Sequence, residues 1–123
     1  PVGISVPQAM YDDFVKISEP IQKIRPDYPF EVKVREPRKR PTRMGGTDAS
    51  VFAIEGVPTL GFTTEDFKGY DFDYGEIWHT ERDLYTKNIP EYQEHTATVT
   101  AIIALGVANL DKQLSREGLY TEE

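Results

Sequence analysis

The sequence predicts an α/β protein in which helices and strands alternate in the order helix, strand, helix, strand, helix. Three patterns support this fold class: apolar residues recur every three or four positions near the start of the chain, every second position around residue 32, and almost continuously between residues 99 and 110. The final helix is apolar on nearly all sides, so it must pack against the sheet on one side and against another part of the protein on the other. We therefore expect a three-layer α/β/α arrangement around a mixed sheet, or the part of one that this chain contains.

The first helix is expected from Ser5 onward. Ser5 and Gln8 form a capping-box pattern, and Pro7 suits the first helical turn. Pro20 interrupts the helix, and because an internal proline costs about 3 kcal/mol, we expect a kink or two short helices meeting near Glu19. The apolar stripe of this helix consists of Met10, Phe14, Ile17, Ile21 and Ile24.

Two strands and two more helices follow. Residues 30–36 alternate apolar and charged side chains, which predicts a strand with one solvent-exposed face near a sheet edge. Residues 56–64, GVPTLGFTT, predict a second, more apolar strand. Between them, residues 47–55 suit a short helix that Thr47 or Asp48 can cap. Residues 89–114 predict the longest helix, with Pro90 in its first turn.

Composition excludes several classes of protein. The 123 residues suit one domain, and the absence of cysteine excludes disulfides, thiolate zinc sites and thiol nucleophiles. The net charge of −7 opposes a general role in nucleic-acid binding. No apolar run is long enough for a membrane span and no signal peptide is evident, so we expect a soluble chain. Because it begins with Pro1 rather than Met, we expect residues 1–123 to be a single partial domain, with its compartment undetermined.

Two charged segments lie between the predicted elements. Residues 35–43, REPRKRPTR, carry five basic residues and one acidic residue; this segment sums to +4, so the remainder of the chain sums to −11. With two prolines, it is interpreted as a solvated, extended loop in preference to an anion-binding or partner-docking segment. Residues 65–77, EDFKGYDFDYGEI, are acidic and aromatic and predict a long loop.

Residues 75–85, GEIWHTERDLY, contain the only tryptophan and one of two histidines. A neutral imidazole such as that of His79 is a common zinc ligand, but zinc requires three or four protein ligands and no HExxH pair is present. A polar surface loop is therefore the alternative. His95 is expected to be a hydrogen-bonded or surface residue of the last helix. A Ser50, His79, Asp48 triad is discounted because no GxSxG turn supports it.

The glycine pair in MGGTDASVF suggests a special turn. Gly45 and Gly46 permit a positive φ or a close backbone approach, and Asp48 can cap the following helix while its carboxylate lies near a pocket mouth. A helix cap without any further role is an equally good interpretation of the same residues.

Taken in order, GGTDASVF, EGVPTLGFTT, WHTERDLY and the long terminal helix resemble the C-terminal half of the co-catalytic zinc aminopeptidase family, whose relatives include glutaminyl cyclase. The resemblance covers residues 46–110; residues 1–45 share only the order of helix and strand. It implies that His79 is a zinc ligand and that Asp48 lies near the site without binding metal. Gly46, Trp78, Thr80 and Asp83 would shape the substrate pocket and the loop after the ligand. Ala49 departs from the family, which often has His or Tyr there.

The resemblance also implies the chemistry. Two zinc ions about 3.5 to 4 Å apart would activate a shared water for peptide-bond hydrolysis at a free amino terminus. The other ligands and the general base would lie upstream, so we expect no catalytic residue in this chain, and weak or no zinc binding and no activity from it in isolation. Asp12, Asp13 and Glu19 are interpreted as a solvated helix flank.

Three other expectations accompany this interpretation. A related tripeptidase or aminoacylase type of metallohydrolase shares the GGTD turn. A non-catalytic domain could instead use residues 65–78 to bind a partner. A partial sheet would also expose strand edges through which copies of the chain could associate.

Overall fold

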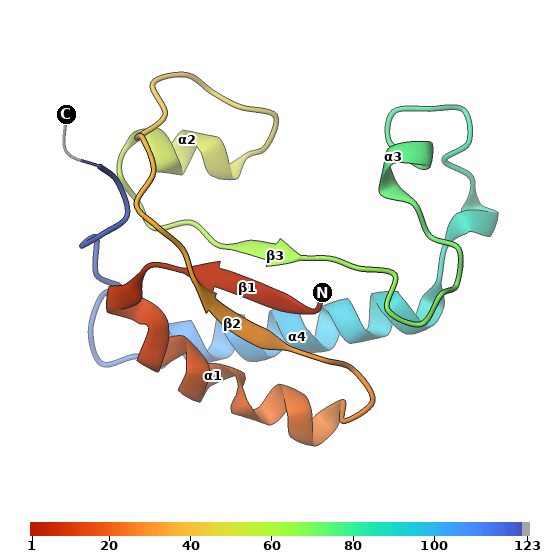
Figure 1. Ribbon diagram of the computed structural model, residues 1–123, viewed down its shortest axis with the longest axis horizontal. Helices are drawn as coiled ribbons and strands as arrows, with labels where there is room; N and C mark the ends of the chain where they lie inside the picture. Colours follow the sequence, from red (N-terminus) through yellow and green to blue (C-terminus); the bar gives the residue numbers. More distant parts are fainter. Residues whose placement is uncertain (122–123) are drawn as a thin grey trace.

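The computed structural model describes residues 1–121 and has an α/β fold built on a three-stranded mixed sheet (Figure 1). The strands are β1 (Gly3–Val6), β2 (Glu31–Val34) and β3 (Gly61–Thr63), in the spatial order β2-β1-β3. β1 pairs with β2 in parallel and with β3 in antiparallel orientation. The predicted strand at residues 30–36 is confirmed and lies at a sheet edge, as expected. The second predicted strand is confirmed only over its last residues.

The prediction that the first helix begins at Ser5 is wrong, because Ser5 lies in β1. Its backbone pairs with Lys33 on one side and Gly61 on the other. Helical structure begins with a 3-10 turn, η1 (Gln8–Met10), and continues as α1 (Tyr11–Ile24). The central place of β1 in the sheet outweighs the local capping pattern, since Ile4 and Val6 alternate toward the core with a period of two.

Helix α1 is a single helix that passes through Pro20, so the expectation of two short helices is wrong. The predicted stripe faces the core at Met10, Phe14 and Ile21, whereas Ile24, at the end of the helix, is exposed. Burial of this stripe against the sheet and the last helix of the chain stabilises the helix, although proline lacks a backbone hydrogen-bond donor.

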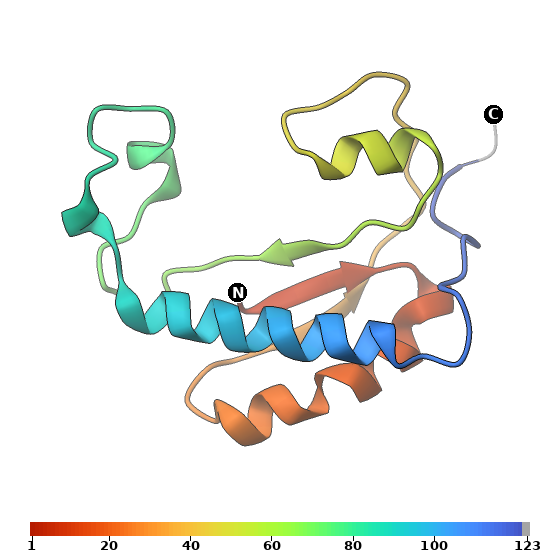
Figure 2. The same cartoon turned by 180° about the vertical axis from the view of Figure 1, so that it is seen from behind.

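Helix α4 (Pro90–Ala108) lies beside α1 on one side of the sheet, as the two opposite views show (Figures 1 and 2). Pro90 occupies its first turn, as predicted. The cover on a second side that we expect for this helix is not present within residues 1–121: Leu105 is 63% exposed, and the fully buried side chains are His95, Val99 and Ile103. These three residues are spaced by four, so one face of α4 is buried.

The core lies between the sheet and these two helices. At Gly106 the helices approach so closely that an added Cβ would lie 2.4 Å from Ile17 Cγ2. The opposite face of the sheet carries Ser5, Glu31 and Lys33, which are partly or fully exposed, as the predicted strand alternation requires. The buried apolar cluster consists of Ile4, Val6, Met10, Phe14, Ile21, Val32, Val99, Ile103 and Leu119.

Three short elements complete the structure: α2 (Ala49–Ile54), α3 (Tyr74–Ile77) and the 3-10 turn η2 (Tyr85–Lys87). In both views α2 and α3 stand on the side of β3 away from α1, near opposite ends of the long axis (Figures 1 and 2). Within residues 1–121, no helix is both long and apolar enough to cross a lipid bilayer.

Candidate functional site

Residues 71–89, which contain α3 and η2 and are called the arm here, border a cavity. This cavity has a volume of about 950 Å³ and lies between the arm, the start of β1 and the first turns of α4. Its lining is acidic, with one lysine, Lys87, and four carboxylates. These carboxylates belong to Glu65, Asp66, Asp73 and Asp83. Aromatic walls from Phe72, Tyr74 and Tyr85 make it a pocket suited to a cation or an amine.

His79 lies on the arm, two residues beyond α3, and is exposed. Its backbone is left-handed, with φ +54°, a conformation that is uncommon for residues other than glycine. The imidazole stacks on Trp78 with 4.0 Å between ring centroids and an interplanar angle of 16°. Within residues 1–121 neither ring nitrogen forms a hydrogen bond, so both can bind a ligand.

Thr80 closes the turn that presents His79. Its hydroxyl lies 2.9 Å from the carbonyl oxygens of both Glu76 and Ile77 and accepts a hydrogen bond from the Arg82 N–H at 3.2 Å. The Asp83 N–H donates to the Thr80 carbonyl at 3.2 Å, and Asp83 lines the cavity. Local hydrogen bonds therefore fold the segment 76–83 without help from the core.

Asp48 and Gly46 lie in another part of the molecule. Asp48 precedes α2 and is exposed, and its side chain makes no capping hydrogen bond. Gly46 has neither a positive φ nor a close neighbour, so the expected special turn at the glycine pair is not formed there. Because α2 and α3 are far apart in both views, the structure does not bring Asp48 and His79 together (Figures 1 and 2). Residues 1–121 contain no group of three His, Asp or Glu side chains placed to hold a metal ion.

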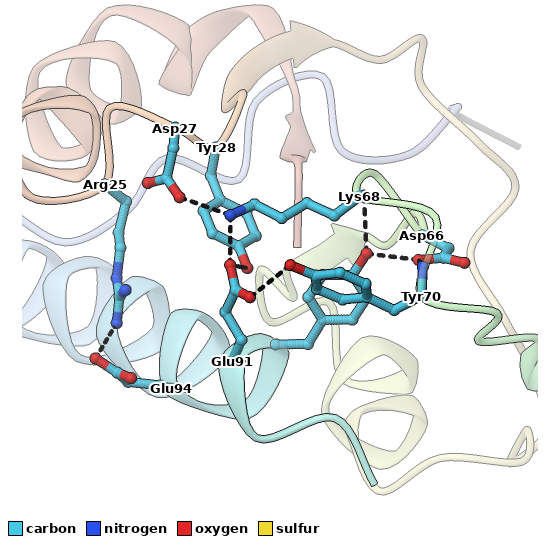
Figure 3. Close-up of polar contacts among 9 residues, drawn as sticks. Arg25, Asp27, Tyr28, Asp66, Lys68, Tyr70, Glu91 and Glu94 are labelled. Atoms are coloured by element: carbon cyan, nitrogen blue, oxygen red, sulfur yellow. Dashed lines mark hydrogen bonds and ion pairs between the residues drawn. The ribbon is translucent and has the colours of Figure 1, made fainter. Parts of the chain in front are cut away.

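A polar cluster that the sequence did not predict fastens residues 66–72, which lead into the arm, to α4 (Figure 3). Lys68 Nζ donates to Asp27 Oδ2 at 2.7 Å and to Glu91 Oε1, and it lies 4.7 Å from the centroid of the Tyr28 ring. The hydroxyls of Tyr28 and Tyr70 donate to the two oxygens of Glu91 at 2.9 and 2.8 Å. We call this group, together with Asp66 and Tyr92, the Lys68–Glu91 cluster.

Asp66 and Tyr92 connect the loop to α4 a second time. The Tyr92 hydroxyl donates to Asp66 Oδ1 at 2.5 Å and accepts from the Lys68 N–H at 2.9 Å. The Asp66 carboxylate also accepts from the N–H groups of Tyr70, at 2.9 Å, and Phe72, at 3.1 Å. Residues 66–72 are thus held in one conformation against the helix that follows the arm.

These contacts shift the acid–base properties of the cluster. Hydrogen bonds from Lys68, Tyr70 and Tyr28 lower the pKa of Glu91 to about 2. Burial, followed by the contact with Glu91, raises the pKa of Tyr28 to about 12. Hydrogen bonds to Asp27 and Glu91 raise the pKa of Lys68. Near neutral pH, Glu91 and Lys68 therefore stay ionised and Tyr28 stays neutral. The cluster positions the loop rather than transferring protons.

His95 is 1% exposed, so the prediction of a hydrogen-bonded helix residue is confirmed and the surface alternative is wrong. Its Nε2 lies 2.8 Å from the Pro1 carbonyl oxygen. Since a carbonyl only accepts, Nε2 carries the proton, and Nδ1 is buried with no hydrogen-bond partner among residues 1–121. Burial is the main cause that lowers the pKa of the imidazole.

Comparison of the chain with models of protein families, with curated proteins and with solved structures finds no match. One sequence signal does point to the unpredicted cluster. Lys68 is the only basic residue of the acidic segment 65–77, and a single cation among several carboxylates favours an ion pair with a carboxylate. The identity of that partner, Glu91, depends on the chain fold.

Proposed function

We propose that this chain is the C-terminal portion of a zinc-dependent aminopeptidase of the co-catalytic type, in which His79 supplies one zinc ligand. The observation that carries the proposal is the presentation of His79. Its ring is exposed, free of hydrogen bonds within residues 1–121, and held on a left-handed backbone, on the same arm as Asp83, which lines the acidic cavity. Backbone strain in an exposed loop is a feature that functional sites often retain.

The proposal requires further protein on the face that carries the arm, and the distribution of apolar side chains supports this. Tyr85 is 91% exposed and Trp78 is 52% exposed, and Val51 and Phe52 of α2 are exposed as well. Apolar side chains exposed on both of these separate projections favour burial against another part of a larger domain. A three-layer α/β/α arrangement would then be completed in the parent protein.

This chain can supply one ligand of a metal site but not a complete set of ligands. A single imidazole binds zinc weakly, since stable sites use three or four protein ligands. When bound, the two zinc ions would supply an activated water and polarise the peptide carbonyl. The role of this chain would be to hold His79 through Trp78 and Thr80 and to attract the substrate ammonium group through Asp83 and Glu65, which line the cavity.

The decisive experiment uses the longer protein that contains this chain. His79→Ala is expected to lower kcat/KM for aminoacyl anilides by about 100-fold or more and to reduce the bound zinc per molecule. Glu81→Gln, two residues away and also exposed, is the matched control and is expected to leave both unchanged. Unchanged turnover in His79→Ala would refute the ligand role.

A second candidate function is a non-catalytic domain that binds a partner through residues 65–78. The acidic and aromatic cavity of about 950 Å³ favours it, because that cavity needs no metal to bind an amine or a basic side chain. Under this alternative, His79→Ala would have no catalytic effect, whereas Glu65→Gln, in the cavity lining, would weaken binding of a lysine-containing peptide to the chain by about tenfold.

A further inference from the structure

The basic segment 35–43, here called the basic loop, has a role that the zinc proposal does not use. The structure confirms it as an extended loop that leaves the carboxyl end of β2 and touches the C-terminal segment through a bridge between Arg38 and Tyr120. β1 and β2 are parallel, so their carboxyl ends lie at the same edge of the sheet. In α/β proteins this edge is the usual location of ligand sites.

The positive charge of the basic loop is not balanced by carboxylates. Among residues 1–121, none of its five basic side chains forms an ion pair. Arg40 Nε instead donates to the Ile54 carbonyl at 2.6 Å, and Arg116 Nη1 lies 3.4 Å from the Glu55 carbonyl. These two guanidinium groups converge beside Gly56 and secure the loop at the end of α2. The loop is therefore held in place without forming an ion pair to any carboxylate of residues 1–121.

Arg35 provides a second sign of unsatisfied positive charge at this edge. Its Nε and Nη2 atoms are buried and have no hydrogen-bond partner within residues 1–121. Burial, followed by repulsion from Arg38, lowers the pKa of the guanidinium group. A nearby anion would relieve that repulsion, because opposite charge favours the protonated form.

A cavity of about 340 Å³ lies between the basic loop and α2. Its polar lining consists of three cations, from Arg38, Lys39 and Arg43, and three hydroxyl groups, from Thr47, Ser50 and Thr59. Within residues 1–121, no acidic residue lines it. The volume falls within the range of about 300 to 1,000 Å³ that is typical of small-molecule sites.

We propose that this cavity binds the phosphate group of a small molecule. Three cations with no carboxylate among them favour an anion with more than one negative charge, which a phosphate monoester has and a single carboxylate lacks. The planar guanidinium groups of Arg38 and Arg43 can each donate two parallel hydrogen bonds to phosphate oxygens. The hydroxyls of Thr47 and Thr59 supply further donors. This assignment does not depend on the zinc proposal, which concerns the opposite end of the molecule.

The test is a titration of the 123-residue chain with inorganic phosphate, followed by amide NMR shifts. We expect saturable shifts in residues 38–50, and none from sodium chloride at equal ionic strength. Acetate is expected to bind at least about tenfold more weakly than phosphate. Shifts that chloride reproduces, or that never saturate, would overturn the proposal, and equal binding of acetate would overturn the choice of phosphate.

Arginine variants test whether phosphate binds in this cavity. Arg38→Gln combined with Arg43→Gln removes two charge-assisted contacts and is expected to weaken phosphate binding by about tenfold or more. Arg82→Gln is the matched control, because Arg82 is an exposed arginine on the arm, and it should bind phosphate like the parent chain. Equal loss in both variants would mean general charge attraction and would contradict a defined site. Should the double variant fail to fold, the comparison of phosphate with chloride on the unaltered chain still decides.

Discussion

The ring of Tyr28 stacks on the imidazole of His95 with 3.9 Å between ring centroids and an interplanar angle of 15°. Tyr28 lies just before β2 and His95 lies on α4, so this contact joins segments separated by most of the chain. The same Tyr28 donates its hydroxyl to Glu91, one turn earlier on α4. One aromatic residue therefore connects the buried histidine to the Lys68–Glu91 cluster.

Burial of His95 predicts that acid destabilises the fold. The imidazole has a pKa near 6.5 in the unfolded chain and a lower pKa in the folded protein. Between these values the unfolded state binds more protons, so the free energy of unfolding falls as the pH drops below about 6.5. Urea unfolding between pH 7.5 and 5.5 measures this slope. His95→Gln should flatten it and His79→Gln should not; a flat profile in the unaltered chain would contradict the prediction.

Loss of the Glu91 carboxylate is expected to loosen the start of the arm. Glu91→Gln removes the ion pair with Lys68 and weakens the hydrogen bonds from Tyr28 and Tyr70. Hydrogen exchange of residues 66–72 should then accelerate by about tenfold or more, since that segment depends on these contacts for its position. Glu94→Gln on the same helix removes only the pair with Arg25 and serves as the control. Equal exchange in the two variants would argue against a positioning role for Glu91.

The Lys68–Glu91 cluster is expected to resist mild acid. The pKa of Glu91 is about 2 in the folded protein and about 4.5 as an ordinary glutamate. Its contribution to stability is therefore complete above about pH 4.5 and is lost as the pH falls from there toward 2. Carboxyl carbon NMR should find Glu91 titrating well below the ordinary glutamate value of 4.5. A midpoint near 4.5 for Glu91 would show that the contact with Lys68 does not persist in solution.

The close approach of α1 and α4 predicts an unfavourable effect of Gly106→Ala. Alanine favours helix over glycine by about 1 kcal/mol, but the new methyl group would lie 2.4 Å from Ile17 Cγ2. Overpacking costs about 1 to 3 kcal/mol, so the net change in unfolding free energy should be destabilising. Gly46→Ala, where nothing lies within 4 Å, is the matched control and should be neutral or slightly stabilising. Gain of stability in Gly106→Ala would place the helices further apart than described.

Phe14 anchors the core, and its truncation tests the fold itself. Phe14→Ala is expected to cost about 3 to 5 kcal/mol in the free energy of unfolding, because the side chain is fully buried between the sheet and α4. Val15→Ala, at the next position and 38% exposed, should cost less than about 1 kcal/mol. Denaturant unfolding of both variants measures the difference. Similar costs would mean that α1 presents another face to the sheet.

Sequence patterns predicted the elements whose periodicity was unambiguous. The alternation around Val32 predicted an edge strand, and Pro90 marked the start of the last helix. The stripe of α1 identified three core residues correctly. The prediction failed at Ser5, where a local capping pattern competed with pairing in the sheet. On α4, composition alone could not identify which side of the helix is buried. A helix rich in small apolar residues has no polar face to reveal which side is buried, so Leu105 and Val99 are indistinguishable in sequence.

The same distinction between local and tertiary information applies to the candidate site. Local sequence alone determined that the segment around His79 folds as a turn, because Thr80 and Asp83 bond to neighbours within a few residues. Local sequence also determined that the basic loop is extended, because the loop contains two prolines and several like charges. Only the tertiary structure decided that Lys68 meets Asp27 and Glu91, and that Asp48 lies far from His79. Those relationships depend on how the sheet and helices bring distant segments together, and a pattern of near neighbours carries no information about distances across the fold.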